Sequence, residues 1–500
     1  MHYYRHIAFL GLLWGFGFFL GGLWWLGASF HVLVVPAVFL PAMICGIVLF
    51  CLFLALFPAT GILIAGFFWT KGSLRIFALA FGLSCSEWMR GHILTGFPWN
   101  LPGMMLAQHL YLMQIAALGG IYLMTFISLV IFAMPATLLS PSKEEPQSRY
   151  LWQSSLLAAL ALAALTLYGY MRIPADDSPV AENIRFRLVQ PHIQQDEKFN
   201  IKNSARIMQH YLDLSTWQSS GTGYKEKRDS ENQKLTKAPA DITHIVWPET
   251  AFPFILDQSP EAVRALAAIL PENSVLITGA ARMEAGLPGE ESGDFYNSLA
   301  LVDSNENLSW IYDKKHLVPF GETTPLFIVK LVHWLHLDDL VNLPGGYTAP
   351  PSRRHVTIPG FSTIAATICY EAVFSGEVLS EEASGQSPDL LLNVTNDGWF
   401  GTSPGPYQHF AQARLRAVEE GLPLLRLANT GISAVIDPYG RIIAQTRLGE
   451  STVLDSFIPL PLERKTLFAQ WRNSLFFIIM LACFFLLMRA RTDRNIFRKE

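Results

Sequence analysis

The stretch TIAATICYEAVF, residues 363 to 374, places a cysteine between a β-type apolar run and a Tyr-Glu pair. The run predicts a buried strand of a layered domain, and Cys369 follows it at a position that suits a nucleophile. The other four cysteines of the chain lie in very apolar segments. A small buried core thiol is the alternative, because free cysteine is among the most buried residue types.

The composition indicates a membrane protein. Hydrophobic residues make up 51% of the 500 residues, charged residues make up 16%, and the mean hydropathy is +0.29. A soluble protein of this length carries more charge. The apolar residues concentrate in residues 1–171 and 474–488. The net charge of −4 argues against a nucleic-acid partner, and five cysteines without paired spacing predict neither a disulfide framework nor a metal site.

Six apolar runs predict membrane helices. The first is long, rich in aromatic residues and without a clear cleavage site, so we expect a retained helix rather than a signal peptide. The second would extend about 57 Å as one helix, against about 30 Å for a bilayer core. It is therefore one long tilted helix or two short spans that turn near residues 58–61. The runs cover residues 6–30, 32–69, 74–89, 115–139, 151–170 and 474–488.

Basic residues beside the spans predict the orientation. Those that follow the last run place the C-terminus in the cytoplasm, and one crossing back places residues 172–470 on the outer, periplasm-like side. An unpaired cysteine is unusual in that compartment, which favours a chemical role for Cys369. The basic residues after the last run are Arg489, Arg491, Arg494, Arg498 and Lys499.

SEWMRGHILTGFPWN, residues 86 to 100, connects the third and fourth runs. Glu87 and Arg90 are three residues apart and can pair on one helical face. Trp99 suits a loop anchored at the level of the lipid headgroups, and a simple interfacial turn is the alternative.

Residues 172–470 alternate short β-rich runs with polar helical stretches, which predicts a layered α/β or α+β domain. The polar residues 219–237 read as a surface insertion. The predicted strands are IRFRLVQ, ITHIVWPE, SVLITGAA, NSLALVD, FSTIAATIC, DLLLNVTND and SAVIDPYG.

Three strand-end motifs carry possible chemistry. In HIVWPETAFP, Glu249 can act as a general base or be a simple turn residue. In WIYDKKHLVPFGE, Lys314 or Lys315 can stabilise an oxyanion or be a solvated charge, with Glu322 close by. A thiolate activated by a base and a cation is the general pattern of covalent acyl chemistry. The order Glu, Lys, Cys makes the set more specific than any one motif.

The chain resembles the apolipoprotein N-acyltransferases, whose outer domain belongs to the nitrilase superfamily. VWPETAFP, YDKKHLVPFGE and ICYEAVF match the three motifs around that superfamily's Glu-Lys-Cys triad. LNVTNDGWFG, QHFAQARLRAVE and PLLRLANTGISAVIDPYG are similar to the family, as are GFGFFLGGLWW and EWMRGHILTGFPW in the membrane part. The resemblance implies a multi-pass helical membrane domain (residues 1–171), an α-β-β-α sandwich (172–470) and a C-terminal helix with a basic tail (471–500).

The resemblance also implies roles. Glu249 is the general base and Cys369 the nucleophile, and Tyr312 aligns the triad lysine with Lys314. The positions that match supporting residues are Glu322, Tyr370 and Glu371.

Two features depart from the family pattern. The family typically has eight membrane helices, and this chain, with about six, begins at what resembles the third. Either the start codon is misplaced or the variant tolerates the loss. In KFN, residues 198–200, Phe199 replaces a tryptophan at a position of substrate contact.

The implied reaction is a ping-pong acyl transfer without a cofactor or metal. An acyl chain moves from a phospholipid to Cys369, and then to the amine of a diacylated apolipoprotein. Both substrates are lipids, which explains the membrane helices, and no nucleic acid takes part. The resemblance implies a bacterial inner membrane, with the catalytic domain facing the periplasm.

The segment PLFIVKLVHWLHLDDLVNL, residues 325–343, is too apolar for a free loop. We expect an interfacial lid in which Trp334 touches lipid, and a buried core helix is the alternative. Trp399 and Phe400 in NDGWF are candidates for the pocket or for the core.

Two other functions compete with this hypothesis. One is a membrane-anchored nitrilase-type amidase with water as the final acceptor, for which a single membrane helix would suffice. The other is a non-catalytic transporter or scaffold, but the few charges within the spans weaken a transport role.

Overall fold

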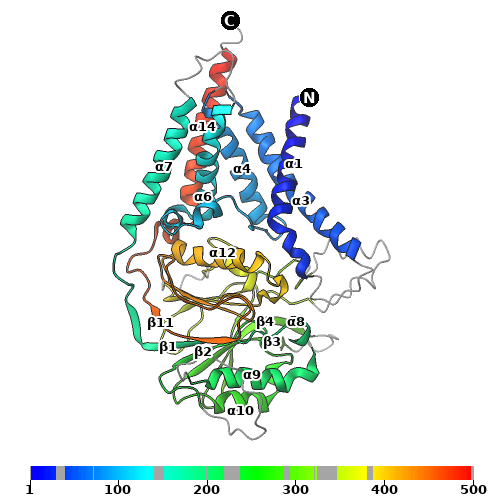
Figure 1. Cartoon of the computed structure of the whole chain (residues 1–500), viewed down its shortest axis with the longest axis vertical. Coiled ribbons are helices and arrows are strands. Elements are labelled where there is room, and N and C mark those ends of the chain that lie inside the picture. The colour runs from blue at the N-terminus through cyan, green and yellow to red at the C-terminus, as the bar shows by residue number, and fades with distance from the viewer. Residues whose placement is uncertain are drawn as a thin grey trace.

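The computed structural model describes residues 2–29, 40–70, 72–139, 151–198, 200–218, 237–284, 293–319, 321–323, 346–379 and 387–496. A bundle of long helices forms one end of the molecule and a layered α/β body forms the other (Figure 1). This arrangement confirms the predicted fold class.

Each of the six apolar runs contains one long helix of the bundle. These helices are α1 (His2–Leu23), α3 (Leu40–Phe67), α4 (Leu74–His92), α6 (Ala116–Ala133), α7 (Leu151–Arg172) and α14 (Ser474–Ile496). Shorter turns between them are η1 (Trp24–Gly27), α5 (Met104–Ala107), η3 (Leu112–Ile115) and η4 (Met134–Leu139).

Five of these helices, within the described part of the chain, are long and apolar enough to cross a membrane. They cover His2–Gly27, Met43–Phe67, Leu112–Thr137, Trp152–Arg172 and Ser474–Thr492. The predicted third span is the exception. It forms α4 as expected, but α4 carries Glu87 and Arg90, and many of its residues are buried in the bundle.

In the described part of the second run, α3 forms one helix that continues through Pro58. The alternative of two short spans is therefore wrong. Helix α1 packs tightly along this stretch: a Cβ atom added at Gly15 would lie 2.4 Å from Pro58 Cγ, and one added at Gly11 would lie 2.9 Å from Ala59 Cα. Such close approach of two helices through small residues is common in membranes.

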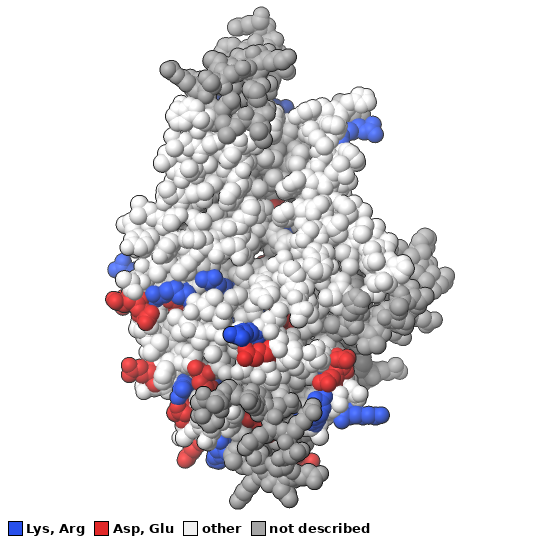
Figure 2. Space-filling view, in the orientation of Figure 1, with Lys and Arg blue, Asp and Glu red and all other residues white. Residues whose placement is uncertain are grey.

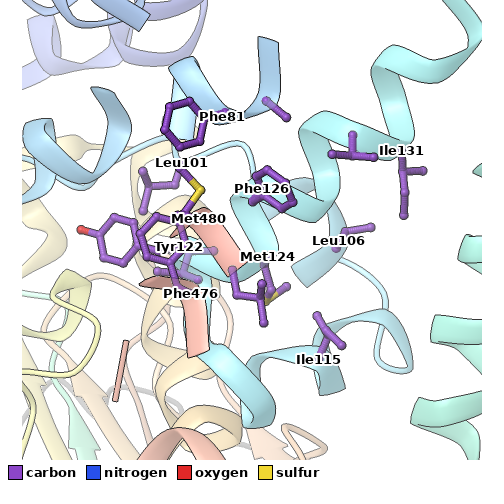
Figure 3. Packing of buried hydrophobic residues seen from close by; sticks show 14 of the residues in the cluster. Phe81, Leu101, Leu106, Ile115, Tyr122, Met124, Phe126, Ile131, Phe476 and Met480 are labelled. Carbon is purple, nitrogen blue, oxygen red and sulfur yellow. The ribbon is translucent and has the colours of Figure 1, made fainter. Parts of the chain in front are cut away.

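The core of the bundle is apolar and lies between α4, α6 and α14. Leu415 and Val418 of α12, which belongs to the α/β body, are part of the same cluster. The two ends of the molecule therefore share one hydrophobic core. Figure 3 labels Phe81, Leu101, Leu106, Ile115, Tyr122, Met124, Phe126, Ile131, Phe476 and Met480 of this cluster.

The α/β body contains two sheets. The six-stranded sheet has the order β11-β1-β2-β3-β4-β5, and the five-stranded sheet has the order β10-β9-β8-β7-β6. The strands are β1 (Val180–Gln190), β2 (His244–Val246), β3 (Val275–Glu284), β4 (Asp294–Asp303), β5 (Leu308–Asp313), β6 (Ile364–Ile368), β7 (Leu390–Thr395), β8 (Leu424–Ala428), β9 (Ala434–Ile436), β10 (Ile442–Gln445) and β11 (Thr452–Pro459).

Side-chain alternation along the strands builds the layers. Phe186 and Leu188 of β1 point into the core between the two sheets, whereas Val189 points into the core beneath the outer helices. On β6, Ile364 packs between the sheets and Ala365 packs against α12. Strands β6, β7 and β8 are parallel and buried on both faces, as parallel sheets usually are.

Helices cover both outer faces, so the body is an α-β-β-α sandwich (Figure 1). The long helix α12 lies between the five-stranded sheet and the bundle. The helices of the body are α8 (Gln195–Lys198), α9 (Ser204–Thr216), α10 (Pro260–Ala268), α12 (Gly405–Glu420) and α13 (Leu467–Trp471), and its short turns are η5 (Ile201–Asn203), η6 (Leu256–Gln258), η8 (Cys369–Val373) and η9 (Asp397–Phe400).

Charge is distributed unevenly between the two ends. On the face shown in Figure 2, Lys, Arg, Asp and Glu lie almost entirely over the sandwich, and the bundle is nearly free of them. A surface of this kind suits a bundle surrounded by lipid.

Most of the predicted insertion at 219–237 lies outside the described residues.

Candidate active site

Cys369 lies where β6 ends and η8 begins, and its side chain is buried at 7% exposure. Its backbone has a φ of 52°, which is the left-handed region that residues with a Cβ rarely adopt. Ile368 N donates a hydrogen bond to Glu371 Oε2 at 2.7 Å, and His409 Nε2 lies 3.1 Å from the Cys369 carbonyl oxygen. The strained turn at the cysteine is thus held from both sides.

Glu249, Lys314 and Glu322 come together in one buried network. Lys314 Nζ lies 3.2 Å from Glu249 Oε1 and 2.8 Å from Glu322 Oε2. The Asn297 side-chain amide donates to both carboxylates at 2.8 Å, and Asn396 N donates to Glu249 Oε2 at 2.9 Å. The predicted grouping of these charged residues is therefore present, and Lys314 rather than Lys315 takes part.

The three residues of the predicted triad occupy similar positions in the fold. Glu249 follows β2, Lys314 follows β5 and Cys369 follows β6, so all three stand just beyond strand ends. Gly279 of β3 permits the turn at Glu249, because a Cβ atom there would lie 2.6 Å from Glu249 Cα.

The pKa of the Cys369 thiol is raised. Burial is the main cause, the charge of Glu249 raises it further, and Lys314 acts in the opposite direction. Burial lowers the pKa of Lys314, but Glu249 and Glu322 outweigh it, so that pKa lies well above the ordinary value. These two pKa shifts favour a neutral thiol at Cys369 and a charged ammonium at Lys314.

Glu371 organises the segment behind the cysteine. Its Oε1 accepts hydrogen bonds from Arg353 Nη2 at 2.8 Å, Tyr312 Oη at 2.9 Å and Lys315 N at 2.8 Å. Glu371 is fully buried, so this carboxylate depends on these donors. Its position is consistent with the predicted supporting role.

Tyr370 connects the cysteine segment to the bundle. Its hydroxyl donates to Gly96 O at 3.1 Å, in the loop after α4, and its ring stacks on Trp99 at 6.4 Å. Gln408 Oε1 accepts from Trp99 Nε1 at 2.8 Å and from Trp25 Nε1 at 3.2 Å. Aromatic side chains from two parts of the bundle therefore pack against the cysteine segment.

Two other predicted pocket residues are described. The Phe400 ring packs edge-on against Trp25 at 4.8 Å and lies 6.1 Å from Trp99, within the same aromatic cluster. Trp399 O accepts a hydrogen bond from Ser29 Oγ at 3.0 Å. Phe199, Trp334 and the whole predicted lid at 325–343 lie outside the described residues.

Several residues near the cysteine had not been predicted from the sequence. His409 Nδ1 lies 2.8 Å from Asp397 Oδ1, and Arg426 Nη2 donates to Asp397 Oδ2 at 2.9 Å. Asp397 follows the end of β7, so the strand-end signal that identified Glu249 could have found it.

Among the described residues, no group of three or more His, Cys, Asp or Glu side chains could hold a metal ion.

Comparison with known proteins gives the same picture for both ends of the chain. Residues 3–134 match the model for the apolipoprotein N-acyltransferase N-terminal domain, and residues 203–466 match the model for carbon-nitrogen hydrolase. The apolipoprotein N-acyltransferase of Rhodopseudomonas palustris is 41% identical over 455 residues, which cover 91% of this chain and 80% of that protein.

Two further relatives are equally similar. The apolipoprotein N-acyltransferase of Bradyrhizobium diazoefficiens is 41% identical, with 81% of this chain and 72% of that protein covered. That of Agrobacterium fabrum is 41% identical, with 89% of this chain and 79% of that protein covered.

Proposed function

We propose a reaction for this site from one premise: the chain belongs to the apolipoprotein N-acyltransferase family. It is therefore a membrane-bound acyltransferase that acts on lipid and lipoprotein substrates, and the hydrolytic alternative is disfavoured. What we propose are the residues, the order of the steps and the orientation in the membrane.

In the first step, Glu249 accepts the thiol proton while Cys369 Sγ attacks the ester carbonyl of a phospholipid. The negative charge that develops on the carbonyl oxygen is stabilised by the Lys314 ammonium and the backbone N–H of Tyr370. The intermediate then collapses, the C–O bond breaks, and the lysophospholipid leaves with the proton from Glu249. An acyl thioester on Cys369 remains.

In the second step, the free α-amine of a diacylglyceryl-cysteine attacks the thioester. The C–N bond forms, the C–S bond breaks, and the amine proton passes through Glu249 to the sulfur. The product is an N-acylated lipoprotein, and the enzyme returns to its neutral thiol. Glu322, Tyr370 and Glu371 hold the reacting groups in place.

One observation carries this proposal: the segment of a buried thiol packs directly against the membrane helices. Tyr370, next to Cys369, is hydrogen-bonded to Gly96 and stacked on Trp99. A lipid ester can reach a site at this position without leaving the bilayer region. We further propose that the membrane is the bacterial inner membrane and that residues 172–470 face the periplasm, as the basic residues after the apolar run 474–488 predict.

The test uses full-length protein in detergent with a phospholipid labelled in its acyl chain. Wild-type protein should carry label on the peptide that contains Cys369, and Cys369→Ala protein should carry none. Cys45→Ala is a matched control, because Cys45 is exposed on α3, and it should label normally. Persistent labelling of Cys369→Ala would refute the assignment of the nucleophile.

A further inference from the structure

Lys198, the last residue of α8, is a second buried lysine beside Glu249. Its side chain is 2% exposed, and Nζ donates hydrogen bonds to the Glu249 carbonyl oxygen at 3.0 Å and to Thr250 Oγ1 at 3.0 Å. Among the described residues, no carboxylate forms an ion pair with this ammonium. A buried cation without a counter-ion is costly, so its position calls for an explanation.

The turn that Lys198 holds is itself strained. Thr250 has a φ of 43°, which is unfavourable for a β-branched residue. Lys198 Nζ donates to the main chain of this turn at Glu249 O and to a side chain at Thr250 Oγ1, so one atom holds both. Because the turn directs the Glu249 carboxylate, Lys198 controls where the proposed base points.

The charges around Cys369 give a second argument. Glu371 is paired with Arg353 at 2.8 Å, and Asp397 is paired with Arg426 at 2.9 Å. Each of these pairs is neutral by itself.

Glu249 and Glu322 form ion pairs with Lys314 alone within the described part of the chain. With both carboxylates ionised, that group of three would carry one net negative charge, which opposes formation of a thiolate. The ammonium of Lys198 makes the group neutral.

We propose that Lys198 is a positioning residue that aims Glu249 and provides the positive charge needed for Cys369 to ionise. This inference rests on the reaction proposed above. When the thiol proton moves to Glu249, negative charge passes from the carboxylate to the sulfur, and Lys198 is close enough to act on both. Burial lowers the pKa of Lys198 to about 8, while the charges of Glu249 and Cys369 counteract this effect.

The experiment measures how fast Cys369 is alkylated by a small neutral reagent, chloroacetamide, as a function of pH. The full-length protein is used in detergent, and mass spectrometry of the Cys369 peptide separates this thiol from the other cysteines. In Lys198→Met the midpoint of the pH profile should move upward, and alkylation at pH 7 should slow about tenfold, as for a change of one pKa unit. Lys198→Arg should restore part of the rate.

Two further variants separate charge from anchoring. Lys198→Gln keeps a donor for the Glu249 carbonyl without the charge, and it should shift the midpoint as Lys198→Met does. Thr250→Val removes one hydrogen bond but leaves the charge, so its midpoint should stay at the wild-type value. The exposed Lys202→Met is the matched control and should behave as wild type. The other charged groups around the thiol, which stay unchanged, are Glu249, Lys314 and Asp397, and His409 contacts the Cys369 carbonyl oxygen.

Wild-type profiles for both Lys198→Met and Lys198→Gln would overturn the proposal. The Gln variant keeps the test decisive where the Met variant does not fold. Failure of the proposed reaction would appear in the labelling experiment instead. Cys369→Ala protein would then still form an acyl-enzyme, and this result does not depend on the alkylation profiles of the Lys198 variants.

Discussion

The helix bundle and the sandwich differ in where they bury charge. Among the described residues of the bundle, Glu87 and Arg90 are the buried charged side chains, and they form one ion pair. The sandwich instead surrounds a single cysteine with buried ion pairs. These are Lys314 with Glu249 and Glu322, Arg353 with Glu371, and Arg426 with Asp397.

The difference shows where each region places its buried charges. Burying an ion pair rarely stabilises a fold more than well-packed apolar residues would. The sandwich buries its ion pairs around Cys369, the proposed nucleophile, where fixed charges would act on the reaction. In the bundle, Arg90 also donates to Phe97 O in the loop that carries Trp99, so even this pair supports the surroundings of the cysteine.

The largest effect is expected at Lys314. Lys314→Met removes the cation proposed to stabilise the oxyanion, and acyl-enzyme formation should slow by about 10²–10³-fold. Lys315→Met is the matched control, because the backbone N–H of residue 315 still reaches Glu371, and it should change the rate only slightly. Initial rates with labelled phospholipid measure both. An equal loss in the two variants would contradict the assignment to Lys314.

The second effect is expected at Glu371. Glu371→Gln breaks the buried ion pair between Glu371 and Arg353, and breaking a buried pair costs on the order of 3–5 kcal/mol. The melting temperature should fall, and the acylation rate should fall with it as the cysteine segment loosens. Glu377→Gln is the control, because that carboxylate is 37% exposed and should matter little. Wild-type melting of Glu371→Gln would show that this network is dispensable.

The bundle provides the third test. Arg90→Met removes the ion-pair partner of Glu87, which is 3% exposed, and should lower the melting temperature. The double variant Glu87→Gln/Arg90→Met leaves no unpaired charge and should recover part of the loss. At a temperature where all variants are folded, activity should drop less than in Glu371→Gln. A double variant that melts below Arg90→Met would reverse this interpretation.

The smallest effect concerns the junction between the two regions. Glu419 of α12 accepts hydrogen bonds from Ile121 N of α6 and from Ser375 Oγ, both at 2.9 Å. Burial raises the pKa of Glu419 from 4.5 to about 7. Because its pKa is higher in the folded state, protonated Glu419 stabilises the fold. This contribution to the free energy of unfolding is fully present below pH 4.5 and is lost as the pH rises through about 7.

Glu419→Gln should remove this dependence. The melting temperature of the variant, relative to wild type, should rise by a few degrees between pH 5 and pH 8. Melting curves at the two pH values measure the difference, and parallel behaviour of the two proteins would contradict the prediction.

Strand-end motifs marked the candidate residues, and the family resemblance chose Lys314 over Lys315. Glu249, Lys314 and Cys369 each follow a β-rich run, but the sequence does not reveal that β6 belongs to a different sheet from β2 and β5. The six helices were predictable because apolar runs are long and distinct. The sequence left open whether the chain continues through Pro58 as one helix, because the close contact between Pro58 and Gly15 of α1 joins residues far apart in the chain.

Other parts of the site depend on partners far apart in the chain. Arg426 and Asp397 meet only because β7 and β8 are neighbours, and in the sequence Arg426 resembles an ordinary strand charge. Lys198 looks like one more charge in the polar stretch DEK. Its burial follows from the way α8 lies against the Glu249 turn, which no local pattern reveals.

The shared core of the bundle has a consequence for the order of synthesis. Phe476, Met480 and Leu487 of α14 complete the apolar cluster begun by α4 and α6. A ribosome makes α14 only after some 300 residues of sandwich have left it, and domains fold largely in the order in which they emerge. Part of the inner faces of the first helices therefore stays uncovered until α14 has been made.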